Sequence, residues 1–211
     1  MVDLPIIILG AGGHAKVIIN TLLVLGANIL GITDPDPRTH GKKVLDTLVL
    51  GGDDCLSDHP VGSVGLVNGV GSTGQIVARR KLYNRFKEMG YEFANVIHPS
   101  AVLAPDVVLD EAVQVMAGTV IQPGAFIGKN TIINTRASID HDCVIGNHSH
   151  IAPGATLSGG ISVGEAVHVG VGATIIQGIK IGAESTVAAG SLVLRDVTEA
   201  STVYGVPAKE K

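Results

Sequence analysis

The most regular feature of the chain is an aliphatic residue at every sixth position. Seventeen consecutive positions at this spacing, from Ile97 to Val193, are Ile, Leu or Val. The position four residues after each of them is mostly small, and Gly often follows the aliphatic residue directly. A period of six matches neither the alternation of a strand nor the turn of a helix. Each repeat is therefore predicted to be one short strand whose aliphatic side chain points inward.

Three such repeats would close a triangular coil of 18 residues, with the small residue filling a corner. We predict that residues 97–198 form a left-handed parallel β-helix of five to six coils, stacked about 4.8 Å apart. An ordinary sheet with a fortuitous pattern is the alternative. Flat sides of this kind favour association around a threefold axis, so we expect a homotrimer. The tail, residues 199–211, is expected to cover the open end of the last coil.

The N-terminal segment reads as a nucleotide-binding βαβ unit. Residues 5–9 predict a buried strand, "GAGGHA" at 10–15 predicts a glycine turn, and residues 14–25 predict a helix. A second strand over 28–33 then ends at an acid, Asp34, in the order of such units. Glycines let the backbone approach a phosphate, and the helix N-terminus favours the anion. A tight turn that binds nothing remains the alternative.

Further elements are predicted before the β-helix: a strand over 64–68, a helix over 74–89 and a strand near 92–96. Residues 40–63 are expected to be rich in loops. The whole predicted domain, residues 1–96, is a small Rossmann-like α/β domain, too short for a full dinucleotide fold. A dehydrogenase therefore does not fit, and a nucleotide carrying one sugar does.

Composition changes this picture little. Only 3% of residues are aromatic although 45% are apolar, and the 28 glycines suit short strands joined by tight turns. The net charge of −4, with no cluster of Lys and Arg, argues against a nucleic-acid surface. Two cysteines are too few for a disulfide framework. No signal peptide or membrane-length segment is recognisable, so we expect a cytoplasmic protein without membrane insertion.

Polar side chains gather in one part of the repeat, residues 133–150. They are Asn134, His141, Asp142, His148 and His150. His168 follows His150 by 18 residues, so these two should stack. A His beside a carboxylate is suited to proton transfer near neutral pH, although any one His can simply be a solvated surface group. The gamma-class carbonic anhydrases bind zinc through three histidines on this scaffold, but their spacing differs, so no metal is expected.

The chain resembles the sugar O- and N-acyltransferases of bacterial glycan synthesis, such as that of lipopolysaccharide O-antigen. It is most similar to the branch that N-acetylates nucleotide-linked 4-amino-4,6-dideoxy sugars. The resemblance rests on "GAGGHA" at 10–15, "TDPDP" at 33–37, "INTRASIDHDCVIG" at 133–146, "HSHIAPGA" at 148–155 and "GVPAK" at 205–209. A likeness to the perosamine N-acetyltransferases of this branch implies a GDP-linked sugar. Gly69-Val70 departs from the Gly-Asn pair of many relatives and leaves the base open.

The resemblance implies acetyl-coenzyme A as cosubstrate, bound along the β-helix between subunits of a trimer, with the nucleotide sugar on the N-terminal domain. It implies His141 as catalytic base and Asp142 as its companion. The implied substrate-binding residues are Gly12, Gly13, His14, Asp34, Asp36, Gly69 and Asn134. The implied cofactor-binding residues are His150, Gly159, Gly205, Pro207 and Lys209.

The implied reaction is direct attack of the sugar C4 amine on the thioester, with a backbone N–H near Gly159 stabilising the oxyanion. Cys143 occupies a small inward position, so no acyl-enzyme is expected. Two other functions remain open. One is O-acetylation of a sugar such as sialic acid, and the other is a non-catalytic trimer that binds nucleotide sugars.

Overall fold

The computed structural model describes residues 4–72 and 76–210. The chain divides into two compact units, residues 1–99 and 100–211. The first unit contains a five-stranded sheet in the order β3-β4-β2-β1-β5. Its strands are β1 (Ile6–Leu9), β2 (Ile29–Thr33), β3 (Lys43–Val44), β4 (Thr47–Gly51) and β5 (Gly65–Asn68). All pair in parallel except the edge strand β3, and the all-aliphatic β1 is buried between β2 and β5.

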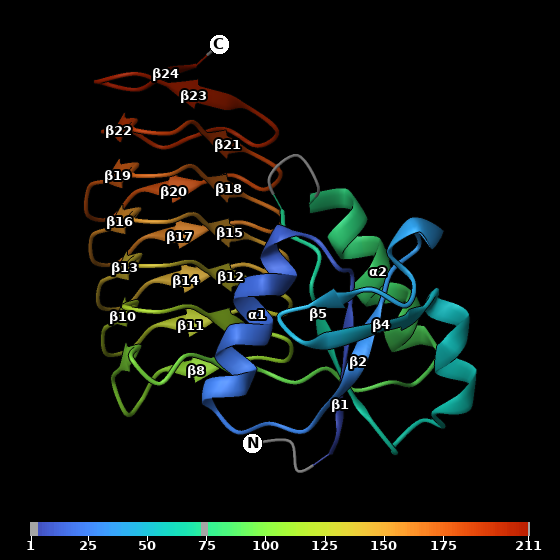
Figure 1. The fold of residues 1–211 in the computed structure, drawn as a ribbon. Helices are drawn as coiled ribbons and strands as arrows, with labels where there is room; N and C mark the ends of the chain where they lie inside the picture. The colour runs from blue at the N-terminus through green and yellow to red at the C-terminus, as the bar shows by residue number, and fades with distance from the viewer. Residues whose placement is uncertain (1–3, 73–75, 211) are drawn as a thin grey trace. The chain divides into compact units, whose positions relative to one another are not determined.

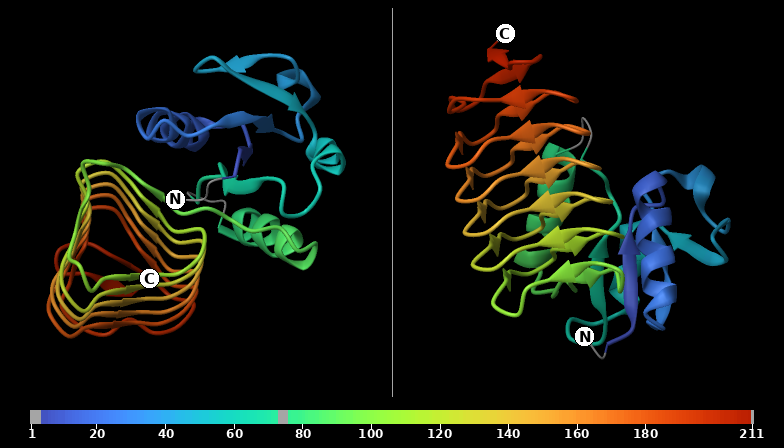
Figure 2. Two further views of the ribbon diagram at one scale, coloured as in Figure 1. Left: turned by 90° about the horizontal axis from the view of Figure 1, so that it is seen from below. Right: turned by 90° about the vertical axis from the view of Figure 1, so that its left-hand side faces the viewer.

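Helices α1 (Gly13–Val24) and α2 (Ile76–Glu88) cover opposite faces of this sheet (Figure 2). Two short 3-10 helices, η1 (Pro37–Thr39) and η2 (Asp53–Asp58), lie in the connections. Helix α1 buries Ala15, Ile18 and Leu22, which recur at helical spacing and form one apolar stripe. The predicted Rossmann-like order of strand, glycine turn, helix and strand is present.

Two expectations for the first unit were wrong. Residues 40–63 are not mainly loop, because β4 pairs with β2 inside the sheet. Within β4, Thr47, Val49 and Gly51 are buried while Leu48 is exposed, which is the alternation of a strand. The strand expected at 92–96 is reduced to a single bridge between Phe93 and Leu66, followed by β6 (Val96–Ile97). The expected start of the second helix, residues 74–75, lies outside the described residues.

The second unit is the predicted left-handed β-helix. Every one of the seventeen aliphatic positions ends a two-residue strand. After β6 the strands are β7 (Val102–Leu103), β8 (Val108–Leu109), β9 (Gln114–Val115), β10 (Val120–Ile121), β11 (Phe126–Ile127), β12 (Ile132–Ile133), β13 (Ser138–Ile139), β14 (Val144–Ile145), β15 (His150–Ile151), β16 (Thr156–Leu157), β17 (Ser162–Val163), β18 (His168–Val169), β19 (Thr174–Ile175), β20 (Lys180–Ile181), β21 (Thr186–Val187) and β22 (Leu192–Val193).

The coils stack in register, so that residues 18 apart pair in parallel (Figure 1). The cross-section is a triangle (Figure 2), and its three faces are named here after their central strands. The β13 face holds β7, β10, β13, β16, β19 and β22, and the β14 face holds β8, β11, β14, β17 and β20. The β15 face holds β6, β9, β12, β15, β18, β21 and the tail strands. Inward residues such as Ile139, Ile145 and Ile151 are fully buried and form the core.

The turns of the β-helix also repeat every six residues. From position 112 to position 190, each sixth residue has a left-handed backbone with positive φ. Many of these residues are Gly, for which this conformation has no steric cost. Asp142 and His148, with φ of 58° and 59°, occupy the same turn position without being glycine.

The tail continues the stack. Strand β23 (Thr202–Tyr204) pairs in parallel with β21, and β24 (Lys209–Glu210) folds back antiparallel to β23. The Ala208 N–H donates to the carbonyl of Leu192 at 2.7 Å. The last strand edges are therefore partly paired. Among the described residues, the helices are all too short or too polar to cross a membrane.

Candidate active site

One corner of the β-helix, between the β13 and β14 faces, carries His141 and Asp142. His141 Nδ1 lies 2.8 Å from Asp142 Oδ2, and the His141 N–H donates to Asp140 Oδ1 at 2.9 Å. Both residues lie in the turn, where the positive φ of Asp142 makes the chain reverse sharply. The sequence-predicted base and its companion are thus in direct contact.

This contact sets the proton chemistry of His141. The hydrogen bond that His141 donates to Asp142 raises the pKa of His141, and the charge of Asp140 adds to the effect. Since Nδ1 donates to the carboxylate, Nε2 is the proton acceptor of the neutral ring. The His141 side chain is 51% exposed, so an incoming amine can reach it.

Gly159 lies one coil further along, against the His141 ring. The Gly160 N–H donates to the carbonyl of His141 at 2.8 Å, which fixes the two turns together. Gly159 is buried, and its own N–H finds no acceptor among residues 4–72 and 76–210. The equivalent turn residues Val171, Gln177 and Ala183 likewise have no backbone acceptor in the described part of the chain, so this open N–H is a regular feature of the turns, and its role as an oxyanion donor stays a prediction.

A second polar pair lies at another corner, between the β15 and β13 faces. Asn134 Nδ2 lies 3.0 Å from His150 Nε2, and Asn134 Oδ1 accepts the Thr135 N–H at 2.8 Å. His150 pairs in register with His168, and their rings lie 5.0 Å apart, which confirms the predicted stacking. Burial lowers the pKa of His168.

The polar segment 133–150 is therefore distributed around the prism rather than gathered into one cluster. His148 belongs to neither pair, because its Nδ1 lies 3.0 Å from Asn130 Nδ2 in the interior of a turn. Across the described residues, no three His, Cys, Asp or Glu side chains are arranged to hold a metal ion. Cys143 is fully buried, its Sγ donates to the Ser158 carbonyl, and burial raises its pKa, so its thiol is unsuited to attack a substrate.

In the first unit, the carboxyl ends of β1, β2 and β5 surround an open cavity of about 450 Å³. Its lining comprises Gly10, Ala11, Gly12, Gly13, His14, Asp34, Pro35, Gly69, Val70 and Gly71. Five of these residues were predicted from the sequence as substrate-binding: Gly12, Gly13, His14, Asp34 and Gly69. Gly69 packs closely against the backbone of Gly10, and a Cβ at position 69 would lie 2.7 Å from the Gly10 carbonyl oxygen. This close packing requires glycine at position 69. Around Gly12 and Gly13 the space is open, and α1 begins there without a side-chain cap.

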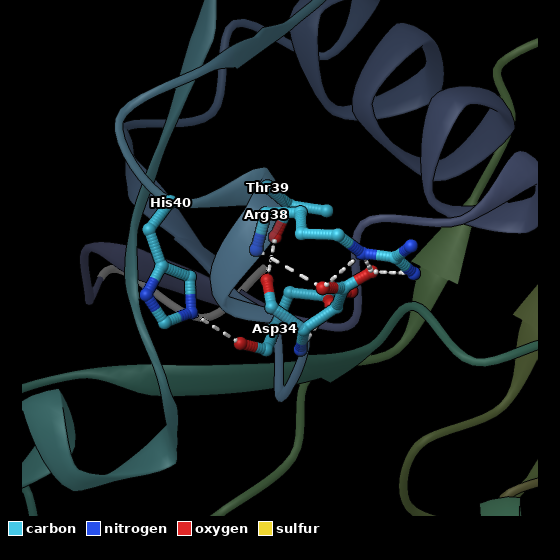
Figure 3. Close-up of polar contacts among 5 residues, drawn as sticks. Asp34, Arg38, Thr39 and His40 are labelled. Atoms are coloured by element: carbon cyan, nitrogen blue, oxygen red, sulfur yellow. Dashed lines mark hydrogen bonds and ion pairs between the residues drawn. The ribbon is translucent and has the colours of Figure 1, made fainter.

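Asp34 organises this loop through hydrogen bonds to the backbone. Its Oδ2 accepts the Ala11 N–H at 2.7 Å, and its Oδ1 accepts the Asp36 N–H at 2.9 Å. His40 Nε2 lies 2.8 Å from the Asp34 carbonyl oxygen (Figure 3). Asp36, by contrast, does not line the cavity. Its carboxylate binds the exposed Arg38 at 2.8–3.0 Å, which lowers the pKa of Asp36.

Two features were missed by the sequence analysis. Arg79 of α2 is completely buried and donates to the carbonyls of Asn68 and Val70, at 3.1 and 2.6 Å, so it braces the loop after β5. Burial lowers the pKa of Arg79 to about 9. A signal existed, because Arg79 shares the buried helix stripe of Tyr83 and Phe86.

The other missed feature is a cavity of about 320 Å³ at the C-terminal end of the β-helix. Two cations, Arg195 and Lys209, line it together with Asp196 and Glu210. The sequence analysis named Lys209 but not Arg195. Gly205 and Pro207, which it also named, are not in the lining; the Gly205 N–H donates to Ser191 Oγ.

Comparisons with known proteins agree with this architecture. Residues 5–86 match the PglD N-terminal domain family, and residues 124–159 match the bacterial transferase hexapeptide family. A structure of an H141N mutant of perosamine N-acetyltransferase from Caulobacter crescentus, in complex with CoA and GDP-perosamine, is 41% identical to this chain. It covers 98% of this chain and 96% of its own, with a TM-score of 0.91.

The acetyltransferase domain of PglB from Neisseria gonorrhoeae FA1090, in complex with acetyl coenzyme A, is 32% identical over 98% of both chains, with a TM-score of 0.90. These similarities confirm the resemblance inferred from the sequence motifs and the two-part fold. The chain therefore belongs to the family of hexapeptide-repeat sugar N-acetyltransferases that carry a PglD N-terminal domain.

Proposed function

We propose that this enzyme transfers the acetyl group of acetyl-coenzyme A to the C4 amine of a nucleotide-linked 4-amino-4,6-dideoxy sugar. GDP-perosamine is the first candidate, because it is the ligand of the perosamine N-acetyltransferase that is 41% identical. The observation that carries the proposal is the exposed His141 whose Nδ1 is held by Asp142. We place the reaction in the cytoplasm.

In this mechanism the lone pair of the neutral C4 amine attacks the thioester carbonyl carbon. His141 Nε2 takes the amine proton, and Asp142 stabilises the imidazolium that forms. The Gly159 N–H, which has no acceptor among the described residues, is the candidate donor to the oxyanion. The carbon–sulfur bond then breaks, and the coenzyme A thiolate takes the proton from the His141 imidazolium, which returns His141 to its neutral form.

The cavity of the first unit is proposed to bind the nucleotide diphosphate. Helix α1 begins without a side-chain cap, and this helix end together with the open space around Gly12 and Gly13 suits an anionic group approaching the backbone. Coenzyme A is proposed to follow the β-helix, with Asn134 and His150 near the thioester. Arg195 and Lys209 of the C-terminal cavity would meet its phosphates.

The active form is proposed to be a homotrimer. Within one chain the His141–Asp142 pair and the Asn134–His150 pair lie at different corners, so a cleft between subunits can combine what one chain separates. An exposed apolar column on the β14 face supports this assembly. It consists of Val108, Phe126 and Val144, which are 54%, 36% and 47% exposed and stack in register.

Sedimentation velocity tests the assembly. We expect a trimer at micromolar concentration, and we expect Phe126→Glu to dissociate it while Thr174→Glu, an exposed position on the β13 face, leaves it intact. A monomeric wild-type protein would contradict both the trimer and a site shared between subunits.

Release of free coenzyme A and mass spectrometry of the sugar product test the reaction. The panel comprises GDP-perosamine, a UDP-linked 4-amino-4,6-dideoxy sugar, the corresponding 4-hydroxy nucleotide sugars and sialic acid. We expect acetylation of an amino sugar and none of its 4-hydroxy counterpart. Preferred acetylation of a hydroxyl would instead establish an O-acetyltransferase, and binding without turnover would establish a non-catalytic nucleotide-sugar-binding protein.

A further inference from the structure

The His141 ring lies directly against the Cα of Gly159. A Cβ added to Gly159 would collide with His141 Nε2, and it would lie 2.5 Å from Cε1 and 2.9 Å from Cδ2. The three nearest atoms to that Cβ all belong to the imidazole. The ring therefore occupies the volume in which any other residue would place its side chain.

The other reasons for glycine in this β-helix do not apply at position 159. Its backbone is not left-handed, whereas the neighbouring Gly160 has a φ of 66°. Nor does it face backbone atoms of the next coil, as Gly146 and Gly164 do. The fold itself would accept a Cβ at position 159, since the only obstacle among its three nearest atoms is an exposed and rotatable side chain.

On this basis, and resting on the proposed function, we propose that Gly159 is a positioning residue: its bare Cα is the seat that holds the His141 ring in contact with Asp142. Gly124 contributes from the coil before, because a Cβ there would lie 2.5 Å from Asp142 Oδ1, the oxygen that His141 does not use. The two catalytic side chains thus lie between two glycines, one in each adjacent coil. Any side chain at position 159 turns the ring away from Asp142.

The test compares Gly159→Ala with Gly178→Ala. Gly178 lies in the following coil with open space around it, at a turn position that Ala occupies natively at 112 and 166. We expect Gly159→Ala to lower kcat about 100-fold, within the range for loss of a general base, with the KM of both substrates changed less than about twofold. Gly159→Ala should melt like the wild type, whereas Gly178→Ala should melt slightly lower, because its left-handed backbone strains Ala, and should keep its kcat. A Gly159→Ala protein that fails to fold, or that keeps normal kcat, would overturn the proposal.

Two further measurements separate the seat from other roles of Gly159. In the double variant His141→Ala/Gly159→Ala, turnover should equal that of His141→Ala alone, because the Cβ acts only through the ring. If the fold-losses in turnover of the two single variants multiply in the double variant, Gly159 has a role independent of the ring, such as that of an oxyanion donor, and the proposed positioning role is contradicted.

An NMR titration of the His141 imidazole, without substrates, needs no activity. The raised pKa of His141 should fall toward its ordinary value in Gly159→Ala and stay raised in Gly178→Ala. An unchanged pKa in Gly159→Ala would overturn the seat, whether or not the enzyme is active. If the wild-type protein itself transfers no acetyl group, while Gly159→Ala still lowers the pKa of His141, the proposed function is rejected and the positioning role of Gly159 stands.

Discussion

The glycine loop of the N-terminal unit and the His141 corner of the β-helix both depend on glycine, but they use their polar side chains differently. In the loop, both carboxylate oxygens of Asp34 accept backbone N–H groups, and Asp36 binds Arg38. At the corner, Asp142 orients the His141 ring, whose Nε2 is left as a proton acceptor. The polar side chains of the loop therefore fix the conformation of the backbone, whereas the corner carries a side chain that can take part in the reaction.

This difference separates binding from chemistry. Substitutions in the loop should raise the Kd or KM of the nucleotide sugar, since they disturb the shape that recognises it. Substitutions at the corner should lower kcat, because they remove a group that acts in the transition state.

His141→Ala should give the largest loss, about 10²–10⁴-fold in turnover. The side chain is half exposed and lies outside the core, so melting temperature and assembly should not change. Steady-state release of coenzyme A measures the effect, and His59→Ala, outside both sites, is the control. Near-normal turnover of His141→Ala would mean that the sugar amine binds in its neutral form and that catalysis depends only on the positioning of the two substrates.

Asp142→Asn should cost less, about tenfold, because the base remains and only its orientation and basicity change. Asn tolerates the left-handed backbone of this position, so the turn should persist. The neutral ring is the active form, and Asp142 raises the pKa of His141, so wild-type activity is lost as pH falls through that raised pKa. The acid limb of the kcat profile should therefore move to lower pH in Asp142→Asn. Glu184→Gln, at an equivalent turn, should leave the limb unmoved.

Many contacts of the β-helix could be predicted because this fold converts sequence spacing into position. Once residues 18 apart are known to stack, the contacts of His148 with Asn130 and of His168 with His150 follow from the numbering. The juxtaposition of Gly159 with His141 follows in the same way. The inward aliphatic positions were predicted for the same reason, since each repeat has only one direction in which to bury its side chain.

The N-terminal unit obeys no such rule. The hydrogen bond from Ala11 to Asp34 joins the ends of two different strands, and nothing in the spacing of these residues encodes it. Strand β4 is short and one-sided, so its alternation was overlooked in a region judged to be loop. Arg79 contradicts the expectation that charged side chains are exposed, and the backbone carbonyls of Asn68 and Val70 that accept its N–H groups offset part of the cost of its burial.

Asp34→Ala should weaken nucleotide-sugar binding about 10–100-fold, the cost of losing charged hydrogen bonds that hold the loop. Acetyl-coenzyme A binding should not change. Isothermal titration calorimetry of each ligand measures both, and circular dichroism checks the fold. Equal losses for the two ligands would show that the substitution unfolds the domain rather than reshaping its loop.

Asp36→Ala should give the smallest effect, a loss of nucleotide-sugar affinity of less than about fivefold. Its carboxylate is engaged by Arg38 at the surface, and exposed ion pairs contribute little. It also lies outside the cavity lining, unlike Asp34. Arg38→Ala is the matched control, because it removes the same ion pair from the other side. If Asp36→Ala weakens binding as much as Asp34→Ala does while Arg38→Ala does not, then Asp36 contacts the ligand itself, and the loop recognises its substrate through a side chain as well as through its backbone.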